Sequence, residues 1–187
     1  MPERKIGNVE SGIKTGDGGK PLSLGKQWFF GVGISEYDEF PNLYNAVKDV
    51  TDVGELLVED YGFLPEHAVT LFNDQATKEN IINKLDEFVE RVDEEDSLLV
   101  YFAGHGHMSA ETKRGSWIPG NAKRSSTSRY LRNSTIRDYL ADIKSKHTLL
   151  IADSSTCCFW MVFTLRTSMG LHGFVGLKPR TLMSYPS

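Results

Sequence analysis

The 187-residue chain has only two cysteines, Cys157 and Cys158, and they are adjacent. A disulfide between neighbouring cysteines would close no useful loop, so these two cannot form the usual stabilising disulfide. This excludes the disulfide-rich class of small secreted domains and favours a reducing, cytoplasmic location. No apolar run approaches the roughly 20 residues that a membrane span needs. Residues 1–20 contain Lys and Arg but no apolar stretch, which excludes a secretory signal there.

The chain also lacks a strong excess of charge of either sign. It has 25 acidic and 21 basic residues, a formal net charge of −4 and a pI of about 5.7. We therefore expect neither nucleic acid nor a membrane surface as a partner. It contains no internal repeat, and its hydrophobic content of 40% is enough for the core of one compact domain.

Short apolar runs alternate with segments in which apolar residues recur at helical spacing. A polar excursion over residues 108–132 interrupts the alternation before a third helix, which Asn133 or Ser134 caps. This order predicts an α/β fold, a mostly parallel sheet with helices on both faces. The expected strands are residues 28–34, 68–72, 97–103 and 147–152, and the first two expected helices are residues 42–59 and 77–92.

Two of the expected strands end in residues that can do chemistry. The strand over residues 97–103 leads into Gly-His-Gly, with His105 at its centre. The strand over residues 147–152 leads into a polar turn and then the two cysteines. Active sites of open α/β sheets lie at the carboxyl ends of the strands. The pattern therefore predicts a cysteine nucleophile with a histidine base.

The chain resembles the caspase-like cysteine peptidases, in particular their bacterial and metacaspase-like members. The resemblance covers about residues 27–154, in family order and with family-like spacing. It implies the caspase-like three-layer sandwich. The matching stretches are residues 30–37, 43–49, 99–106, 115–119 and 149–154.

The resemblance also implies roles for individual residues. His105 matches the catalytic base and general acid, and the backbone N–H of Gly106 would help to form the oxyanion hole. Asp49 and Asp153 match positions that line the pocket for the residue before the scissile bond, where two carboxylates favour Arg or Lys. The implied substrate is a peptide or protein, and no cofactor is required. Calcium activates some relatives, but this chain has no calcium-loop motif.

The chain departs from the family pattern at the nucleophile. The pattern Asp-Ser-Cys-Phe-Ser-Gly is replaced by Asp153-Ser154-Ser155-Thr156-Cys157-Cys158-Phe159, so serine stands where cysteine is expected. Cys158 matches only after a three-residue insertion, and Cys157 is the second candidate. The main hypothesis is a cysteine endopeptidase. The alternative is a catalytically inactive homologue that acts as a binding or regulatory module.

The chain divides into a flexible leader over residues 1–26, a catalytic domain over residues 27–155, and an atypical tail over residues 156–187. The tail has no clear periodicity, and we expect it to be either disordered or foreign to the family. The sheet would then be truncated after its fourth strand. An uncovered strand edge can pair with another chain, so we expect a dimer through that edge.

Plainer interpretations of the same residues stay open at this point. Asp49 could be a solvated helix residue, Asp153 a turn cap, and the two cysteines buried apolar residues. Two histidines at i and i+2, His105 and His107, are weak support for a zinc site without further ligands. The Gly31-Val32-Gly33 stretch lacks the third glycine and the lysine of phosphate-binding loops.

Overall fold

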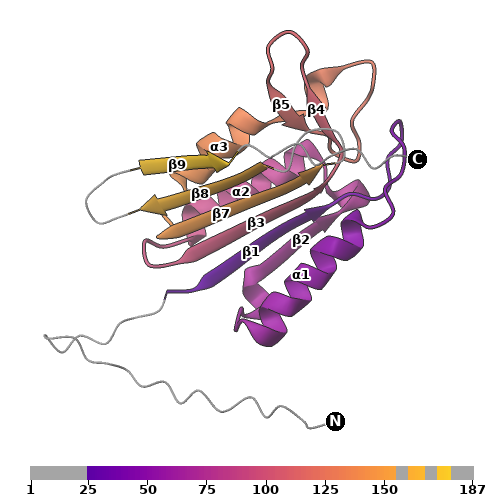
Figure 1. Cartoon of the computed structure of the whole chain (residues 1–187). Coiled ribbons are helices and arrows are strands. Elements are labelled where there is room, and N and C mark those ends of the chain that lie inside the picture. The colour runs from indigo at the N-terminus through magenta and orange to yellow at the C-terminus, as the bar shows by residue number, and fades with distance from the viewer. Residues whose placement is uncertain (1–24, 155–159, 167–171, 178–187) are drawn as a thin grey trace, which may run out of the picture.

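The computed structural model describes residues 25–154, 160–166 and 172–177, and a six-stranded sheet forms its centre (Figure 1). The strand order is β2-β1-β3-β7-β8-β9, in which the first four strands run parallel and the last two antiparallel. The strands are β1 (Gln27–Gly33), β2 (Ala68–Phe72), β3 (Ser97–Gly104), β7 (His147–Ser154), β8 (Trp160–Arg166) and β9 (His172–Leu177).

Helices cover both faces of this sheet, as the alternation of patterns predicts. Helix α1 (Ala46–Asp60) packs on one face, and α2 (Lys78–Arg91) and α3 (Asn133–Asp142) pack on the other. Single 3-10 turns span Pro65–His67, Asn73–Gln75 and Thr127–Arg129. None of the helices in the described ranges is long and apolar enough to cross a membrane.

The helix bounds follow from local hydrogen bonds. Thr77 caps α2 through its side chain, which accepts from the backbone N–H of Asn80, as the sequence predicts. Helix α1 begins later than the expected residue 42 because the backbone N–H of Leu43 bonds to the Ser35 carbonyl oxygen instead of entering a helix.

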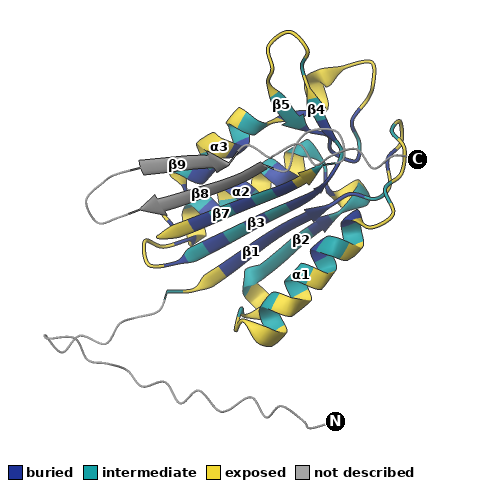
Figure 2. Ribbon diagram, viewed as in Figure 1, coloured by how far each residue is buried: buried dark blue, intermediate teal, exposed yellow. Residues whose placement is uncertain are grey.

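Strand β1 is buried on both faces, which explains its continuous apolar run (Figure 2). Phe29 faces α1, while Trp28 and Phe30 belong to the larger core with α2 and α3. Gly31 and Gly33 let α1 approach closely. A Cβ on Gly31 would lie 2.5 Å from Cγ1 of Val50, and one on Gly33 would lie 2.9 Å from a backbone oxygen of α1. These glycines therefore serve helix packing.

The sheet does not end at its fourth strand, which corrects the expectation of a truncated sheet. Strand β8 pairs antiparallel with β7, and β9 pairs with β8, so residues of the atypical tail extend the sheet. An antiparallel neighbour needs only a short connection and no crossover helix. The edge of β7 that we expected to mediate dimerisation is occupied by β8, which removes the basis of that expectation.

The polar excursion after β3 contains a second, small sheet. Strands β4 (Gly106–Met108), β5 (Gly115–Trp117) and β6 (Leu131–Arg132) pair antiparallel in that order. Trp117 attaches this sheet to the core because its ring stacks on Phe102, with ring centroids 4.1 Å apart. The small sheet therefore stands at the carboxyl ends of the central strands, directly after His105 (Figure 1).

Candidate active site

His105 lies between the end of β3 and the start of β4, at the carboxyl edge of the parallel strands. Its backbone N–H donates to the buried hydroxyl of Tyr37 at 2.8 Å, and its carbonyl oxygen accepts from the N–H of Ile118 at 2.9 Å. The Tyr37 ring packs against the imidazole, with centroids 4.8 Å apart. The backbone on both sides of the imidazole is thus fixed by the rest of the fold.

The imidazole itself is held by the loop that connects β1 to α1. Nε2 of His105 lies 2.7 Å from the carbonyl oxygen of Pro41. A carbonyl oxygen can only accept, so Nε2 carries a hydrogen and the neutral ring has its acceptor lone pair on Nδ1. The geometry therefore selects the tautomer in which Nδ1 is the basic nitrogen.

Two polar residues give this loop its shape. Oδ1 of Asn73 accepts from the backbone N–H groups of Ser35 and Glu36, at 2.9 and 3.2 Å. Oδ1 of Asn42 accepts from the N–H of Tyr37 at 3.1 Å and closes the turn that carries Pro41. Asn73 has a positive φ of 44°, a conformation that asparagine adopts more readily than most residues. These contacts place the Pro41 carbonyl beside the imidazole.

Gly106 presents its backbone N–H away from β5. Gly106 faces Trp117 across the β4–β5 ladder, and the Ile118 N–H bonds to the carbonyl of the preceding residue, His105. That bond makes Gly106 and Trp117 a non-hydrogen-bonded pair of the antiparallel ladder. In such a pair the N–H group of each residue points away from the partner strand. The N–H of Gly106 is therefore not used by the β4–β5 ladder.

Asp49 and Asp153 reach the same side of the sheet from different elements. Asp49 lies in the first turn of α1 and is half-buried, whereas Asp153 is exposed and lies opposite Ala103 in the β3–β7 register. Burial raises the pKa of the Tyr101 hydroxyl, and the charges of Asp153 and Asp49 raise it further. Both carboxylates therefore contribute to the electrostatic environment of one hydroxyl at this edge of the sheet.

The other predicted site residues have different outcomes. Cys157 and Cys158 lie outside the described residues, as does Ser155. His107 is half-buried in β4, and its ring contacts the Tyr130 ring with centroids 5.3 Å apart. Within the described ranges, no group of three or more His, Cys, Asp or Glu side chains is placed to hold a metal ion.

Comparison with protein families decides the lineage of this arrangement. The model of the caspase domain family matches residues 31–169, more than half of the chain. The chain belongs to the caspase domain family. The match runs into the tail, beyond residue 155, where the family pattern first becomes hard to follow in the sequence. Strand β8 lies wholly within the matched residues.

Relatives of this caspase domain include fungal metacaspases. The chain is 31% identical over 87 residues to metacaspase-1A of Neurospora crassa, a match that covers 43% of the chain and 19% of that protein. It is 37% identical over 82 residues to metacaspase-1B of Aspergillus oryzae, covering 40% of the chain and 19% of that protein. The matched region therefore spans about a fifth of the length of these relatives.

A solved structure of a Geobacter sulfurreducens protein has the same fold. The TM-score is 0.57 at 17% identity, and the similarity covers 69% of this chain and 50% of that protein. Together with the sheet order, this similarity supports the predicted caspase-like architecture.

Several residues of the site carry no motif that identifies them in the sequence. Pro41 holds the imidazole through its carbonyl oxygen, a group that every residue has. Asn73 follows β2 directly and binds the loop that holds His105 from a distant part of the sequence. Tyr37 lies in a stretch that resembles the family, residues 30–37, but only the structure shows that its hydroxyl holds the backbone of His105.

Proposed function

We propose that this caspase domain is a cysteine endopeptidase that cleaves peptide bonds after Arg or Lys through a Cys-His dyad. The observation that carries the proposal is the anchored imidazole of His105, whose Nε2–H donates to the Pro41 carbonyl and leaves Nδ1 as the base. Cys158 is the proposed nucleophile, and Cys157 is the alternative.

The proposed reaction uses these groups in sequence. Nδ1 of His105 accepts the thiol proton, and the sulfur attacks the carbonyl carbon of the scissile bond. The negative charge that develops on the carbonyl oxygen is stabilised by the N–H of Gly106, a type of donor worth about 100- to 1,000-fold in rate. His105 then gives its proton to the leaving amine, and water hydrolyses the acyl-enzyme.

The two carboxylates support selection of a basic side chain. Asp49 and Asp153 both raise the pKa of Tyr101, so they create a negative potential on the α1 side of the sheet edge. A guanidinium or ammonium group entering this space would gain charge-assisted hydrogen bonds that a neutral side chain cannot form.

The test measures cleavage of fluorogenic peptides ending in Arg, Lys or Asp under reducing conditions. We expect cleavage after Arg and Lys only, and a loss of about 100-fold or more in His105→Ala. His107→Ala, two residues away, is the matched control and should retain activity. Activity that survives His105→Ala would overturn the dyad.

Variants of the cysteines test the choice of nucleophile, and variants of the two aspartates test the preference for basic side chains. Cys158→Ala should abolish cleavage, and Cys157→Ala should not if Cys158 is the nucleophile. Asp49→Asn and Asp153→Asn should raise KM for Arg substrates by about tenfold each, because each removes one charge-assisted contact. Asp52 lies on the same helix and forms an ion pair with Lys48, so Asp52→Asn is the control and should leave KM unchanged.

A second candidate function is favoured by the serine at position 155. Because the family pattern has cysteine there, a non-catalytic caspase domain that binds a partner would also account for the sequence. No cleavage of any peptide, together with no labelling of either cysteine by a peptidyl-arginine electrophile, would establish this alternative over the peptidase.

A further inference from the structure

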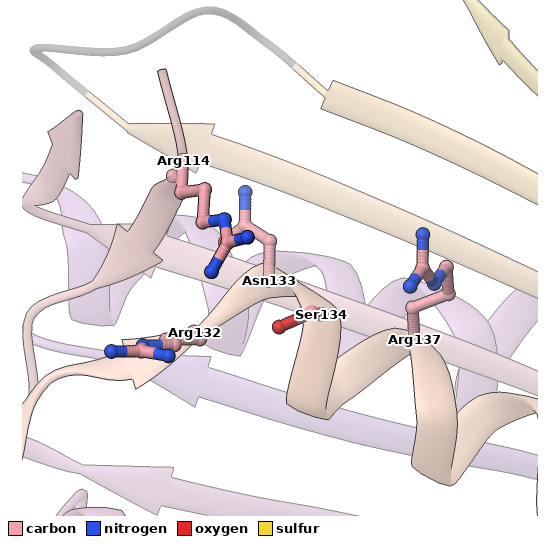
Figure 3. A pocket seen from close by; sticks show the side chains of 6 residues that line it. Arg114, Arg132, Asn133, Ser134 and Arg137 are labelled. Atoms are coloured by element: carbon pink, nitrogen blue, oxygen red, sulfur yellow. The ribbon is translucent and has the colours of Figure 1, made fainter. Parts of the chain in front are cut away.

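Three arginines from separate segments line one surface pocket, although the chain as a whole is acidic. The cavity has a volume of about 410 Å³ and lies where the start of β5 meets β6 and the start of α3 (Figure 3). Its lining residues are Arg114, Gly115, Arg132, Asn133, Ser134 and Arg137. We call it the arginine pocket.

In the part of the chain that the structure describes, few ion pairs balance the arginines of this pocket. Among the described residues, neither Arg114 nor Arg132 forms an ion pair, and Arg137 has only its neighbour Asp138 at 3.6 Å. All three side chains are exposed, so they can turn toward a ligand. The guanidinium fork suits oxyanions because it offers two parallel N–H donors to two oxygens.

The start of α3 adds backbone N–H donors to those of the arginines. The N-cap residue is Arg132, it makes no capping side-chain hydrogen bond, and the first turn contains no acidic residue. The positive end of the helix dipole therefore adjoins arginines, which is the electrostatically unfavourable choice at a helix start. An anion bound there would satisfy the backbone N–H groups and neutralise the repulsion together.

Two polar side chains complete the lining. Figure 3 shows Arg114 extending toward the Asn133 amide, and the Ser134 hydroxyl on the side of Arg132. Oδ1 of Asn133 is buried and has no hydrogen-bond partner among the described residues. A Cβ at Gly115 would lie 2.5 Å from Nδ2 of Asn133, so glycine at this position leaves room for the amide. Oδ1 can only accept and so cannot bind an anion, whereas Nδ2 of Asn133 and the Ser134 hydroxyl are side-chain donors among the lining residues that an oxyanion could use.

We propose that the arginine pocket binds a phosphomonoester group, on a phosphorylated side chain or as free phosphate. Such a group carries nearly two negative charges and three acceptor oxygens near neutral pH. It can engage two guanidinium forks and the helix N–H groups together, whereas a carboxylate offers one charge and two oxygens. The net charge of −4 opposes binding along an extended polyanion such as nucleic acid.

Calorimetric titration of the full chain tests the proposal. The ligands are inorganic phosphate and three peptides of one sequence that carry phosphoserine, serine or glutamate at the same position. We expect saturable binding of phosphate and of the phosphoserine peptide, no binding of the serine peptide, and at least about tenfold weaker binding of the glutamate peptide. Tighter binding of the phosphopeptide than of phosphate identifies a phosphorylated side chain as the ligand, and equal affinity identifies the free group.

Charge-matched variants locate the binding. Arg114→Gln and Arg132→Gln should each weaken binding about tenfold or more, because each removes one charged fork. Lys144→Gln removes the same charge just beyond the other end of α3 and should change the affinity by less than about twofold. Three outcomes would overturn the proposal: no saturable binding of phosphate or of the phosphoserine peptide, equal losses in Lys144→Gln, or equal binding of the glutamate peptide.

Discussion

At the scale of single residues, His105 is positioned by groups that act on its backbone and its ring separately. Tyr37 and Ile118 hold the backbone, while the Pro41 carbonyl holds Nε2. The Tyr37 hydroxyl is buried, and burial raises its pKa well above the usual range while the His105 N–H lowers it. The hydroxyl therefore stays neutral and remains a hydrogen-bond acceptor throughout the working range of pH.

Replacement of Tyr37 by Phe tests this support. The variant keeps the ring packing but removes the hydroxyl that accepts from the part-buried N–H of His105, which should lower the free energy of unfolding by about 1 kcal/mol. Urea denaturation measures the change. Tyr44→Phe is the matched control because Tyr44 is 100% exposed, and it should have no effect. Equal effects in the two variants would contradict the role of Tyr37.

Side chains that follow strands were predictable from the sequence, whereas backbone acceptors were not. His105 and Asp153 stand directly after apolar runs, and their positions at the carboxyl edge follow from the parallel sheet. The Pro41 carbonyl has no sequence signature, because its role depends on a turn closed by Asn42 and Asn73. Gly106 was predicted as an oxyanion donor from resemblance, and the direction of its N–H comes only from the register of β4 and β5.

At the scale of elements, the contact between β1 and α1 sets where Asp49 lies. The helix approaches β1 over Gly31 and Gly33, and Val50 fills the space above Gly31. Asp49 precedes Val50 in the chain, so a shift of α1 away from the sheet would move its carboxylate away from Tyr101. The glycines thereby connect packing to the electrostatics of the candidate site.

Replacement of Gly31 by Ala tests this packing. The added Cβ would meet Cγ1 of the fully buried Val50 at 2.5 Å, and overpacking of this kind costs about 1–3 kcal/mol. Gly54→Ala is the control, because its nearest contact is the Phe29 ring at 3.1 Å and alanine gains about 1 kcal/mol of helix propensity. Thermal denaturation should show a clear loss for Gly31→Ala and a smaller loss or a gain for Gly54→Ala. No loss in Gly31→Ala would mean that α1 and β1 are not tightly packed at this position.

Long periodic elements were predictable from the sequence, and short ones were not. The four parallel strands and the helices α1 and α2 appear close to their expected bounds, because continuous apolar runs and helical spacing reflect burial. Strands β4, β5 and β6 have only two or three residues each, too few to show a period. Strand β8 begins within an apolar run, but it pairs antiparallel with β7 and no helix separates the two strands in the sequence. The alternation of strand and helix patterns that indicates the parallel strands is therefore missing here.

At the scale of the whole molecule, a net charge of −4 conceals two regions of opposite sign. Asp49 and Asp153 make the α1 side of the sheet edge negative, while the arginine pocket lies beside α3, which packs on the opposite face of the sheet. The average charge of the chain therefore predicts neither region. If both proposals hold, the two ligands would bind on opposite faces of the sheet and would not compete.

One buried carboxylate connects the amino ends of the central strands. Asp96 is 3% exposed and accepts from the Lys26 N–H at 2.7 Å, the Trp28 indole at 2.9 Å and the Asp93 N–H at 3.1 Å. Its backbone carbonyl accepts from the N–H of Lys146, just before β7. Burial by itself would raise the pKa of Asp96, but the hydrogen bonds from Trp28, Asp93 and Lys26 hold it below the usual value.

This lowered pKa determines how the stability of the whole fold should depend on pH. Because Asp96 stays charged to lower pH when folded than when unfolded, its contribution is complete above about pH 4 and is lost as the pH falls through the folded value. Asp96→Asn should therefore cost about 1–3 kcal/mol near pH 7, measured by urea denaturation.

Repeating this comparison of unfolding free energies at lower pH distinguishes the contribution of the Asp96 charge from that of its packing. The gap in unfolding free energy between Asp96→Asn and the native chain should narrow as the pH falls below about 4, because the unfolded native chain then takes up a proton that the folded carboxylate resists, whereas the amide of the variant binds none. Asp93→Asn is the control, because the Asp93 side chain is 79% exposed and only 3.9 Å from Lys26 Nζ in a loose ion pair. A gap that stays constant from pH 7 to pH 3 would show that Asp96 stabilises the strand ends by packing rather than by its charge.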